Sequence, residues 1–247
     1  MADSAPPNER LTLPTPERVL VMLAHPDDAE FGAGGTIARL AANGSHVVVV
    51  VVTDGSQGTD DPDATGDALF NRRQAEQHNA AEILGIAEVH FLGFPDGRIY
   101  NNETLREALV RQIRRHRPDL LITHDPTTRI WDEIGMINHP DHRAVGDTTL
   151  DAVYPLARDR LSFPQHEAEG LAPHKVLELF LTGSNQPNFA VDISETLEAK
   201  IDSIVAHVSQ IAEPEQLRTM MTERAKETGE RWGMDAAEQF RRLTLWR

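Results

Sequence analysis

Two short segments of the chain carry the side chains that metal binding and proton transfer require. Residues 24–30 (AHPDDAE) hold one imidazole and three carboxylates, and residues 138–142 (NHPDH) hold two imidazoles on either side of a carboxylate. A catalytic zinc ion commonly takes three protein ligands and keeps a position for water. His25, one Asp of the first segment and one His of the second would supply those ligands. The remaining carboxylate would then be free to accept a proton from the water.

Each segment also has an ordinary structural interpretation as the start of a helix. Pro26 suits a first helical turn, and Asp27 or Asp28 could accept backbone N–H bonds as an N-cap, as Asp141 could in the second segment. Capping explains one aspartate, but it explains neither His25 nor an adjacent carboxylate that repels the first. Most other histidines stand singly and are expected to be ordinary core or surface residues. They include His46, His90, His116, His166, His174 and His207.

The elements that must position these segments alternate in type along the chain. Strands alternating with helices indicate βαβ units, and hence a Rossmann-like α/β fold with a doubly wound, mainly parallel sheet and flanking helices. Both segments follow predicted parallel strands, so both are expected to face one crevice at the carboxyl ends of the strands. The strands are predicted at 18–24, 46–53, 88–92, 119–124 and 175–182, and the helices at 35–43, 69–84, 102–116, 142–156 and from Glu195 onward.

Composition excludes several classes of function. The 247 residues include no cysteine, so there is no disulfide scaffold, thiolate zinc finger, iron–sulfur cluster or cysteine nucleophile, and a metal site must use His, Asp and Glu. A net charge of −15 argues against binding to nucleic acid or to an anionic membrane. No apolar run is long enough to span a bilayer, and the protein is expected to be cytoplasmic. Residues 1–17 are interpreted as a flexible N-terminal arm, and 18–247 as a single domain with a C-terminal helical extension.

The two His-Pro-Asp segments together resemble the paired signatures of the PIG-L/LmbE-like zinc-dependent N-acetylglucosaminyl deacetylases. Further segments agree in order and spacing, and the resemblance extends over residues 19–150. These segments are Thr53–Gly55, Arg72–Glu76 and Gly93–Arg98. The resemblance implies an LmbE-like fold and a metal-dependent amidohydrolase. Its reaction would remove an acetyl or other acyl group from the amide nitrogen of an N-acetylated amino sugar or glycoconjugate.

Roles for individual residues follow from the same resemblance. His25, Asp28 and His142 match the ligands of Zn²⁺, a set that also accepts other divalent ions. Asp27 matches the general base. The family also raises the expectation of a symmetric homo-oligomer.

The resemblance also implies roles for residues that would contact the substrate or orient their neighbours. His139 matches the residue that stabilises the tetrahedral oxyanion, Asp141 is expected to orient its neighbours, and Arg73 fits a substrate-binding arginine next to the alternative Arg72. Some deacetylases of the mycothiol pathway carry a tyrosine shortly before the second motif. Residues 135–138 (GMIN) have none, which leaves the identity of the sugar open.

Two other functions compete with this one. A dinucleotide-binding protein would use the glycines of residues 32–35 (GAGG) with Asp54 on the ribose. The third glycine of that motif would fall at Ile37, and the carboxylates of residues 27–30 would repel a pyrophosphate. These glycines are better explained by close packing of the first helix. The second alternative is a metal-binding relative without catalysis.

Overall fold

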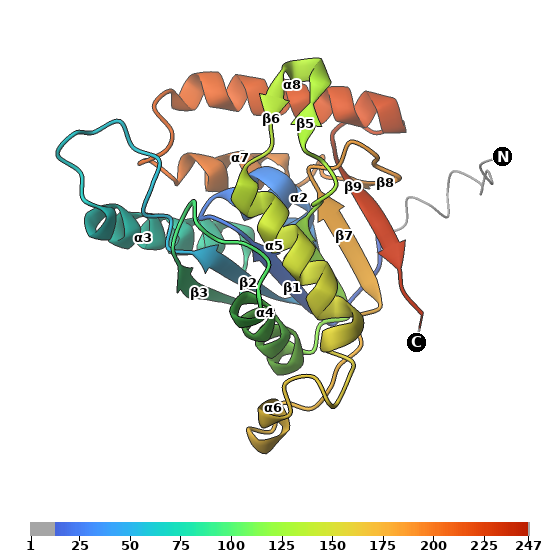
Figure 1. The fold of residues 1–247 in the computed structure, drawn as a ribbon. Coiled ribbons are helices and arrows are strands. Elements are labelled where there is room, and N and C mark those ends of the chain that lie inside the picture. The colour runs from blue at the N-terminus through green and yellow to red at the C-terminus, as the bar shows by residue number, and fades with distance from the viewer. Residues whose placement is uncertain (1–12, 247) are drawn as a thin grey trace.

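Residues 13–246 are described by a computed structural model, in which helices cover both faces of a central sheet (Figure 1). The strands are β1 (Arg18–Leu23), β2 (His46–Thr53), β3 (Glu88–Phe94), β4 (Leu120–His124), β5 (Ile130–Trp131), β6 (Met136–Ile137), β7 (Glu178–Thr182), β8 (Phe189–Asp192) and β9 (Ala237–Thr244). The helices are α2 (Asp28–Ala42), α3 (Gly66–Leu84), α4 (Glu103–His116), α5 (Pro140–Asp151), α6 (Gln165–Ala168), α7 (Leu197–Val205) and α8 (Pro214–Trp232), with the short η1 (Asp132–Ile134) and η2 (Ala152–Leu156).

The main sheet has seven strands in the order β3-β2-β1-β4-β7-β9-β8. Neighbours from β3 to β7 are parallel, whereas β9 runs antiparallel to both β7 and β8. The chain adds β2 and β3 on one side of β1 and then crosses to β4 on the other side. The predicted α/β fold with a mainly parallel sheet is therefore confirmed. Its topological switch point lies between β1 and β4, where open α/β sheets bind their ligands.

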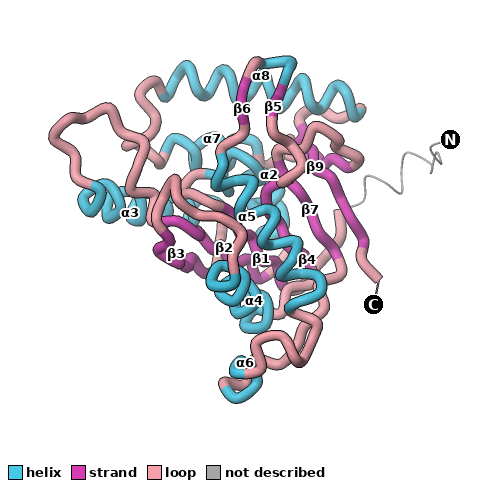
Figure 2. Tube along the Cα trace, viewed as in Figure 1, coloured by secondary structure: helices cyan, strands magenta, loops and turns pink. Residues whose placement is uncertain are grey.

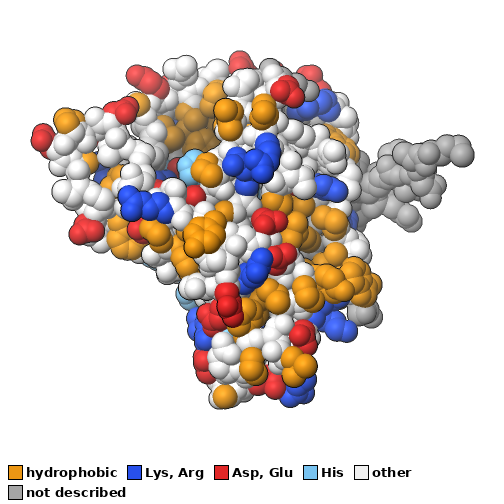
Figure 3. Space-filling model, in the orientation of Figure 1, with side chains coloured by type: hydrophobic (Ala, Val, Ile, Leu, Met, Phe, Trp, Pro, Cys, Tyr) orange, Lys and Arg blue, Asp and Glu red, His pale blue; other side chains and the backbone are white. Residues whose placement is uncertain are grey.

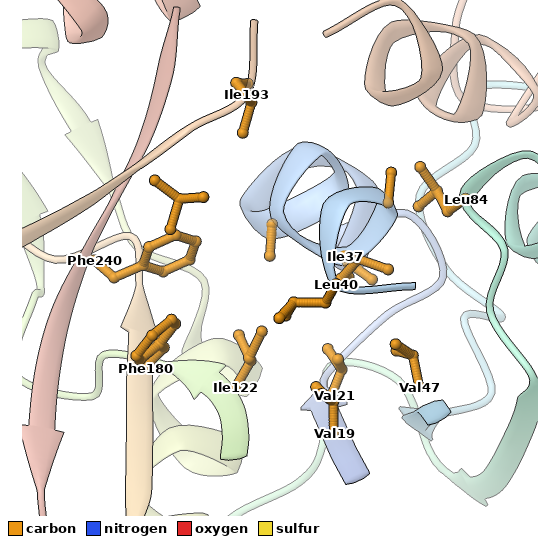
Figure 4. Packing of buried hydrophobic residues seen from close by; sticks show 14 of the residues in the cluster. Val19, Val21, Ile37, Leu40, Val47, Leu84, Ile122, Phe180, Ile193 and Phe240 are labelled. Carbon is orange, nitrogen blue, oxygen red and sulfur yellow. The ribbon is translucent and has the colours of Figure 1, made fainter. Parts of the chain in front are cut away.

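One face of the sheet packs against α2, α3, α7 and α8. Because side chains alternate along a strand, Val19 and Val21 of β1 point to this face, where Ile37 and Leu40 of α2 cover them (Figure 4). Phe240 of β9 extends the core on this same face toward the β8 edge of the sheet. This packing fixes α2, and with it the residues at its N-terminus, against β1.

The opposite face packs against α4 and α5. Leu20 and Met22 of β1 point to this side and share a core with Leu109 and Ile113 of α4 and Val145 of α5. In Figure 1, α4 and α5 lie in front of the sheet and α2 and α7 behind it. Both faces of β1 are thus buried, as its uninterrupted apolar sequence indicates.

The first helix begins earlier than the sequence pattern predicts. The pattern predicts a helix over 35–43, whereas α2 starts at Asp28; its glycines weaken helix propensity and obscure the first turns. The same glycines allow close contacts. A Cβ at Gly35 would lie 2.7 Å from Cγ2 of Ile193, and one at Gly32 would lie 2.8 Å from the hydroxyl of Thr182. These two glycines therefore serve packing.

The helical prediction for the C-terminal region is wrong over its last part. α7 and α8 lie after Glu195, but Ala237–Thr244 forms β9, and the short strand β8 was also missed. The polar sequence of β9 has no clear strand pattern; pairing with β7 and β8 decides its conformation. Arg242 lies over the ring of Phe189 and forms an ion pair with Glu178, so polar side chains of β9 are used at the sheet.

The N-terminal arm was predicted to be flexible over residues 1–17. Residues 1–12 lie outside the described part of the chain. From residue 13 onward the chain contacts the fold: Leu13 packs against the core, and the carbonyls of Pro16 and Glu17 accept hydrogen bonds from Ser45 and His46. Among residues 13–246, no helix has the length and apolar character needed to cross a membrane.

Candidate active site

The two His-Pro-Asp segments meet at the switch point of the sheet. The first follows β1 and leads into α2, and the second leads into α5, which packs against β4 and β1. The long loop between β2 and α3 and the β5–β6 hairpin rise at the same end of the sheet (Figure 2). A space-filling view shows a hollow between that loop, the hairpin and α5, with histidine and acidic side chains at its edge (Figure 3).

His25, Asp28 and His142 lie in mutual contact. Nδ1 of His25 is 3.4 Å from Oδ2 of Asp28 and 3.3 Å from Nε2 of His142, which is 3.0 Å from Oδ1 of Asp28. Donor atoms bound tetrahedrally at about 2.0–2.1 Å from Zn²⁺ lie about 3.3–3.4 Å apart. The donor set and its spacing therefore fit a divalent ion. The structure brings together all three predicted ligands.

Two carboxylates contact the other ring nitrogen of His25. Nε2 is 3.3 Å from Oδ2 of Asp141 and 3.2 Å from Oδ1 of Asp96. Asp141 is fully buried and also accepts the backbone N–H of Gly97 at 2.7 Å. Metal-binding histidines usually donate their second N–H to a carboxylate in this way, so Asp141 lies where it can orient His25. The contact of Asp96 was missed, because an Asp-Gly turn is common and does not by itself indicate a ligand partner.

His124 is a further histidine of the cluster that the sequence did not single out. It ends β4, its Nε2 is 3.3 Å from Oδ2 of Asp28, and its ring stacks on His142 with centroids 4.1 Å apart. Burial, followed by the charge of His142, lowers its pKa to about 4, so the ring is neutral at pH 7. Its place at the carboxyl end of the strand beside β1 was the available signal.

Asp27 has an unusual backbone conformation. Its φ of 93° lies in the left-handed region, which is uncommon for a residue other than glycine, and its side chain caps no backbone N–H of α2. Its N–H donates to Gln77 at 3.1 Å, and its Oδ2 accepts from Arg73 at 3.4 Å. The capping interpretation therefore fails for Asp27, since neighbours outside α2 hold it in place.

The neighbouring Arg73 and Arg72 differ in burial and in their partners. Arg73 is 4% exposed and donates to the carbonyls of Pro26, Gly55 and Gln57 as well as to Asp27. The more exposed Arg72 pairs with Glu76 instead. Arg73 is thus the arginine beside the cluster, where its hydrogen bonds join it to protein groups. Its contact with substrate stays a prediction.

His139 is the N-cap of α5 and is exposed. Its Nδ1 accepts the backbone N–H of Asp141 at 3.2 Å, and its ring meets that of His25 edge-on with centroids 4.7 Å apart. Burial and the charge of His25 lower the pKa of His139. Because Nδ1 accepts a bond, the proton of the neutral ring resides on Nε2. His139 therefore presents an N–H donor next to the ligand cluster.

The two adjacent aspartates have opposite electrostatic environments. Burial and the charge of Asp28 raise the pKa of Asp27 to about 7. Burial would also raise the pKa of Asp28, but His142 and His124 hold it well below its usual range. One carboxylate thus stays ionised while its neighbour can gain a proton near neutral pH, a separation typical of acid–base sites.

The environment of His25 is strongly negative. Burial would lower its pKa, but hydrogen bonds to Asp141, Asp28 and Asp96 outweigh that effect and raise the pKa to about 12. The carboxylates that favour a proton on this ring would equally favour a divalent cation. The electrostatics and the donor spacing therefore point to the same use.

The segment that carries this site is similar to known proteins. The family model described as PIG-L, GlcNAc-PI de-N-acetylase, matches residues 20–153. A diacetylchitobiose deacetylase of Thermococcus kodakarensis is 36% identical over 197 residues, which cover 80% of this chain and 71% of that protein. A 1D-myo-inositol 2-acetamido-2-deoxy-alpha-D-glucopyranoside deacetylase of Saccharopolyspora erythraea is 29% identical over 252 residues, covering 81% and 80%.

A solved structure extends the similarity to the fold. The N,N'-diacetylchitobiose deacetylase from Pyrococcus horikoshii aligns with a TM-score of 0.85 at 29% sequence identity. The alignment covers 93% of this chain and 84% of that one.

Proposed function

The chain belongs to the PIG-L family, and on that basis we propose that it is a zinc-dependent hydrolase that removes the acetyl group from an N-acetylated amino sugar. The observation that carries the proposal is the contact of His25, Asp28 and His142 at 3.0–3.4 Å, with Asp27 beside them. A metal-binding protein without catalysis would have no need of a second aspartate held in a strained conformation.

The metal ligands in this proposal are His25, Asp28 and His142. Asp141 orients His25 through its contact with the other ring nitrogen, Nε2. Two imidazoles and one carboxylate suit Zn²⁺ and also accept other divalent transition metals. When bound, zinc supplies a Lewis acid and lowers the pKa of a coordinated water to about 7. The remaining chemistry belongs to side chains of the chain itself.

Asp27 is the general base. Its carboxylate accepts a proton from the attacking water and then delivers a proton to the amide nitrogen, which leaves as the amine while the acyl group leaves as acetate. A pKa raised to about 7 suits both transfers near neutral pH. Arg73 and Gln77 position Asp27 for this role through their bonds to its side chain and backbone.

His139 stabilises the oxyanion that forms when water adds to the amide carbonyl. The bond that its Nδ1 accepts from Asp141 leaves Nε2–H free to donate. Because the ring is exposed at the start of α5 and lies against His25, the donor is available to a substrate that approaches the ligand cluster. Removing one such donor typically costs ~10²–10³ in rate.

The substrate is an N-acetylglucosamine-containing sugar, and diacetylchitobiose is the first member to test. Two of the similar proteins are diacetylchitobiose deacetylases. The β5–β6 hairpin above the site exposes the apolar side chains of Ile134, Met136 and Ile137, and Trp131 lies against Gly183. This hairpin would form one wall of the sugar site.

A panel of N-acetylated sugars tests the proposal. The zinc-loaded protein is incubated with diacetylchitobiose, N-acetylglucosamine and an N-acetylglucosaminyl inositol, and release of primary amine and acetate is measured. We expect equal amounts of amine and acetate from at least one sugar, and release slowed by ~10²–10⁴ in the Asp27→Asn variant at equal zinc content. A folded, zinc-loaded protein that releases amine from no sugar would overturn the proposed function.

A further inference from the structure

A second group of imidazoles and a carboxylate lies at the opposite end of the sheet. Glu88 begins β3, His90 lies two residues further on, and His116 ends α4. One ligand atom from each residue lies within 4.8 Å of those of the other two. We call these three residues the edge cluster. The sequence pattern leaves both histidines isolated, because they lie 26 positions apart in the chain.

The fold explains why these residues meet. Glu88 and His90 pair with Val48 and Val50 of β2, whose side chains point to the face covered by α4. Side chains two residues apart share a face of a strand, so both project toward α4. The last turn of α4 brings His116 to the same place, with its ring centroid 5.1 Å from that of His90.

Contacts within the edge cluster already resemble a ligand set. Nε2 of His90 is 2.9 Å from Oε2 of Glu88, and Nε2 of His46 is 3.0 Å from the other oxygen, Oε1. Nε2 of His116 is buried and has no hydrogen-bond partner among the described residues. A buried ring nitrogen without a partner has an unused bonding position.

We propose that Glu88, His90 and His116 form a second binding site for a divalent transition-metal ion such as Zn²⁺, with His46 orienting Glu88. Two imidazole nitrogens and one carboxylate oxygen suit Zn²⁺, Co²⁺, Ni²⁺ or Cu²⁺, whereas Ca²⁺ and Mg²⁺ prefer oxygen ligands alone. The ligand atoms lie within 4.8 Å of one another, so reaching the about 3.3 Å separation of a tetrahedral site shortens each distance by at most about 1.5 Å. The half-exposed side chains of Glu88 and His90 allow the rotations that this requires.

Electrostatics support the same use. Glu88 supplies the carboxylate of the cluster, which contacts the rings of both His90 and His46. The C-terminal end of α4 adds a negative partial charge next to a bound cation.

The edge cluster is separate from the candidate active site. His46 and Thr53 are the two ends of β2, and seven steps of about 3.3 Å place those ends roughly 23 Å apart. A metal bound at the edge cluster would join β3, at the edge of the sheet, to the last turn of α4. We therefore expect it to stabilise that corner of the fold without taking part in the reaction.

Zinc stoichiometry tests this proposal. The wild type and the variants His90→Ala and His116→Ala are loaded with excess Zn²⁺, dialysed against metal-free buffer and analysed for zinc per chain. We expect each variant to retain one equivalent fewer than the wild type, whatever the occupancy of the candidate active site. The matched control is His78→Ala, a histidine of α3 outside both clusters, which should retain the wild-type content.

Two further measurements separate metal binding from a folding defect. Added Zn²⁺ should raise the melting temperature of an EDTA-treated His78→Ala protein more than that of an EDTA-treated His90→Ala protein, whatever the melting temperatures of the two variants in EDTA. Glu88→Gln, which keeps the side-chain shape, should behave like His90→Ala. Equal zinc content in the wild type, His90→Ala and Glu88→Gln would overturn the proposal.

Discussion

The two ends of the parallel sheet each gather histidines and carboxylates, but they do so in different ways. At the carboxyl ends, the side chains of His25 and Asp28 are 10% and 11% exposed and come from one contiguous segment. At the amino ends, those of His90 and Glu88 are 34% and 44% exposed, and His116 is supplied by a distant helix. Burial makes the first cluster electrostatically stronger, since charges interact more strongly away from water. We therefore propose that similar side-chain types serve chemistry at the buried end of the sheet and stability at the more exposed end.

Substitution of the proposed general base, Asp27, should change activity the most. Asp27→Asn should lower kcat by ~10²–10⁴ while zinc content stays at the wild-type value, because the proton acceptor is lost and the ligands remain. Asparagine tolerates the left-handed conformation at this position, so the fold should be preserved. Steady-state kinetics with metal analysis checks both parts. Near-wild-type turnover would remove Asp27 from the role of base.

Loss of a ligand should affect metal and activity together. His142→Ala removes one of the three side chains whose nearest nitrogen and oxygen atoms lie 3.0–3.4 Å apart, so zinc retained after dialysis should fall below that of the wild type and activity should fall ~10²-fold or more. The zinc held by the edge cluster should be unaffected. An unchanged zinc stoichiometry would exclude His142 as a ligand. It would also contradict the proposal that the cluster at the carboxyl ends of the strands binds the catalytic metal.

Substitution of Asp141, which contacts the proposed ligand His25, should have a smaller effect on metal affinity. Asp141→Asn keeps a side chain of the same size beside Nε2 of His25 but removes its charge, and partners of this kind typically contribute ~10–100-fold in metal affinity. Competition with a fluorescent zinc chelator measures the change. As a control, Asp147→Asn alters an exposed carboxylate further along α5 and should leave affinity unchanged. Equal affinity in Asp141→Asn would show that Asp96 alone orients His25.

The smallest effect on activity should come from stripping the edge cluster. Titration of the zinc-loaded protein with a chelator should remove the edge ion first, because its ligands are more exposed, and amine release should stay within about twofold until the second ion leaves. Zinc content and activity are followed in the same samples. If activity fell as soon as the first ion was lost, the proposal that the edge cluster serves stability and not the reaction would be contradicted.

Features encoded within a few neighbouring residues could be predicted without the structure. The apolar runs of β1 and β2 specify buried parallel strands, and the alternation with helices specifies the α/β class. The contiguous segment from His25 to Asp28 places a candidate ligand and a candidate base together whatever the rest of the chain does. The second segment supplies His142 in the same way, so all three predicted ligands lie within two short motifs.

The distant residues that join these motifs could not be predicted in the same way, because folding brings them together. His124 and Asp96 reach the ligand cluster because β4 lies beside β1 and the loop after β3 folds over it, and no local pattern encodes those contacts. β9 is a strand because β7 and β8 pair with it, against its polar sequence. The edge cluster likewise exists because α4 packs across β2 and β3 and brings His116 to His90. Periodicity and short motifs act over one turn or strand, whereas pairing and packing act between elements that only folding brings together.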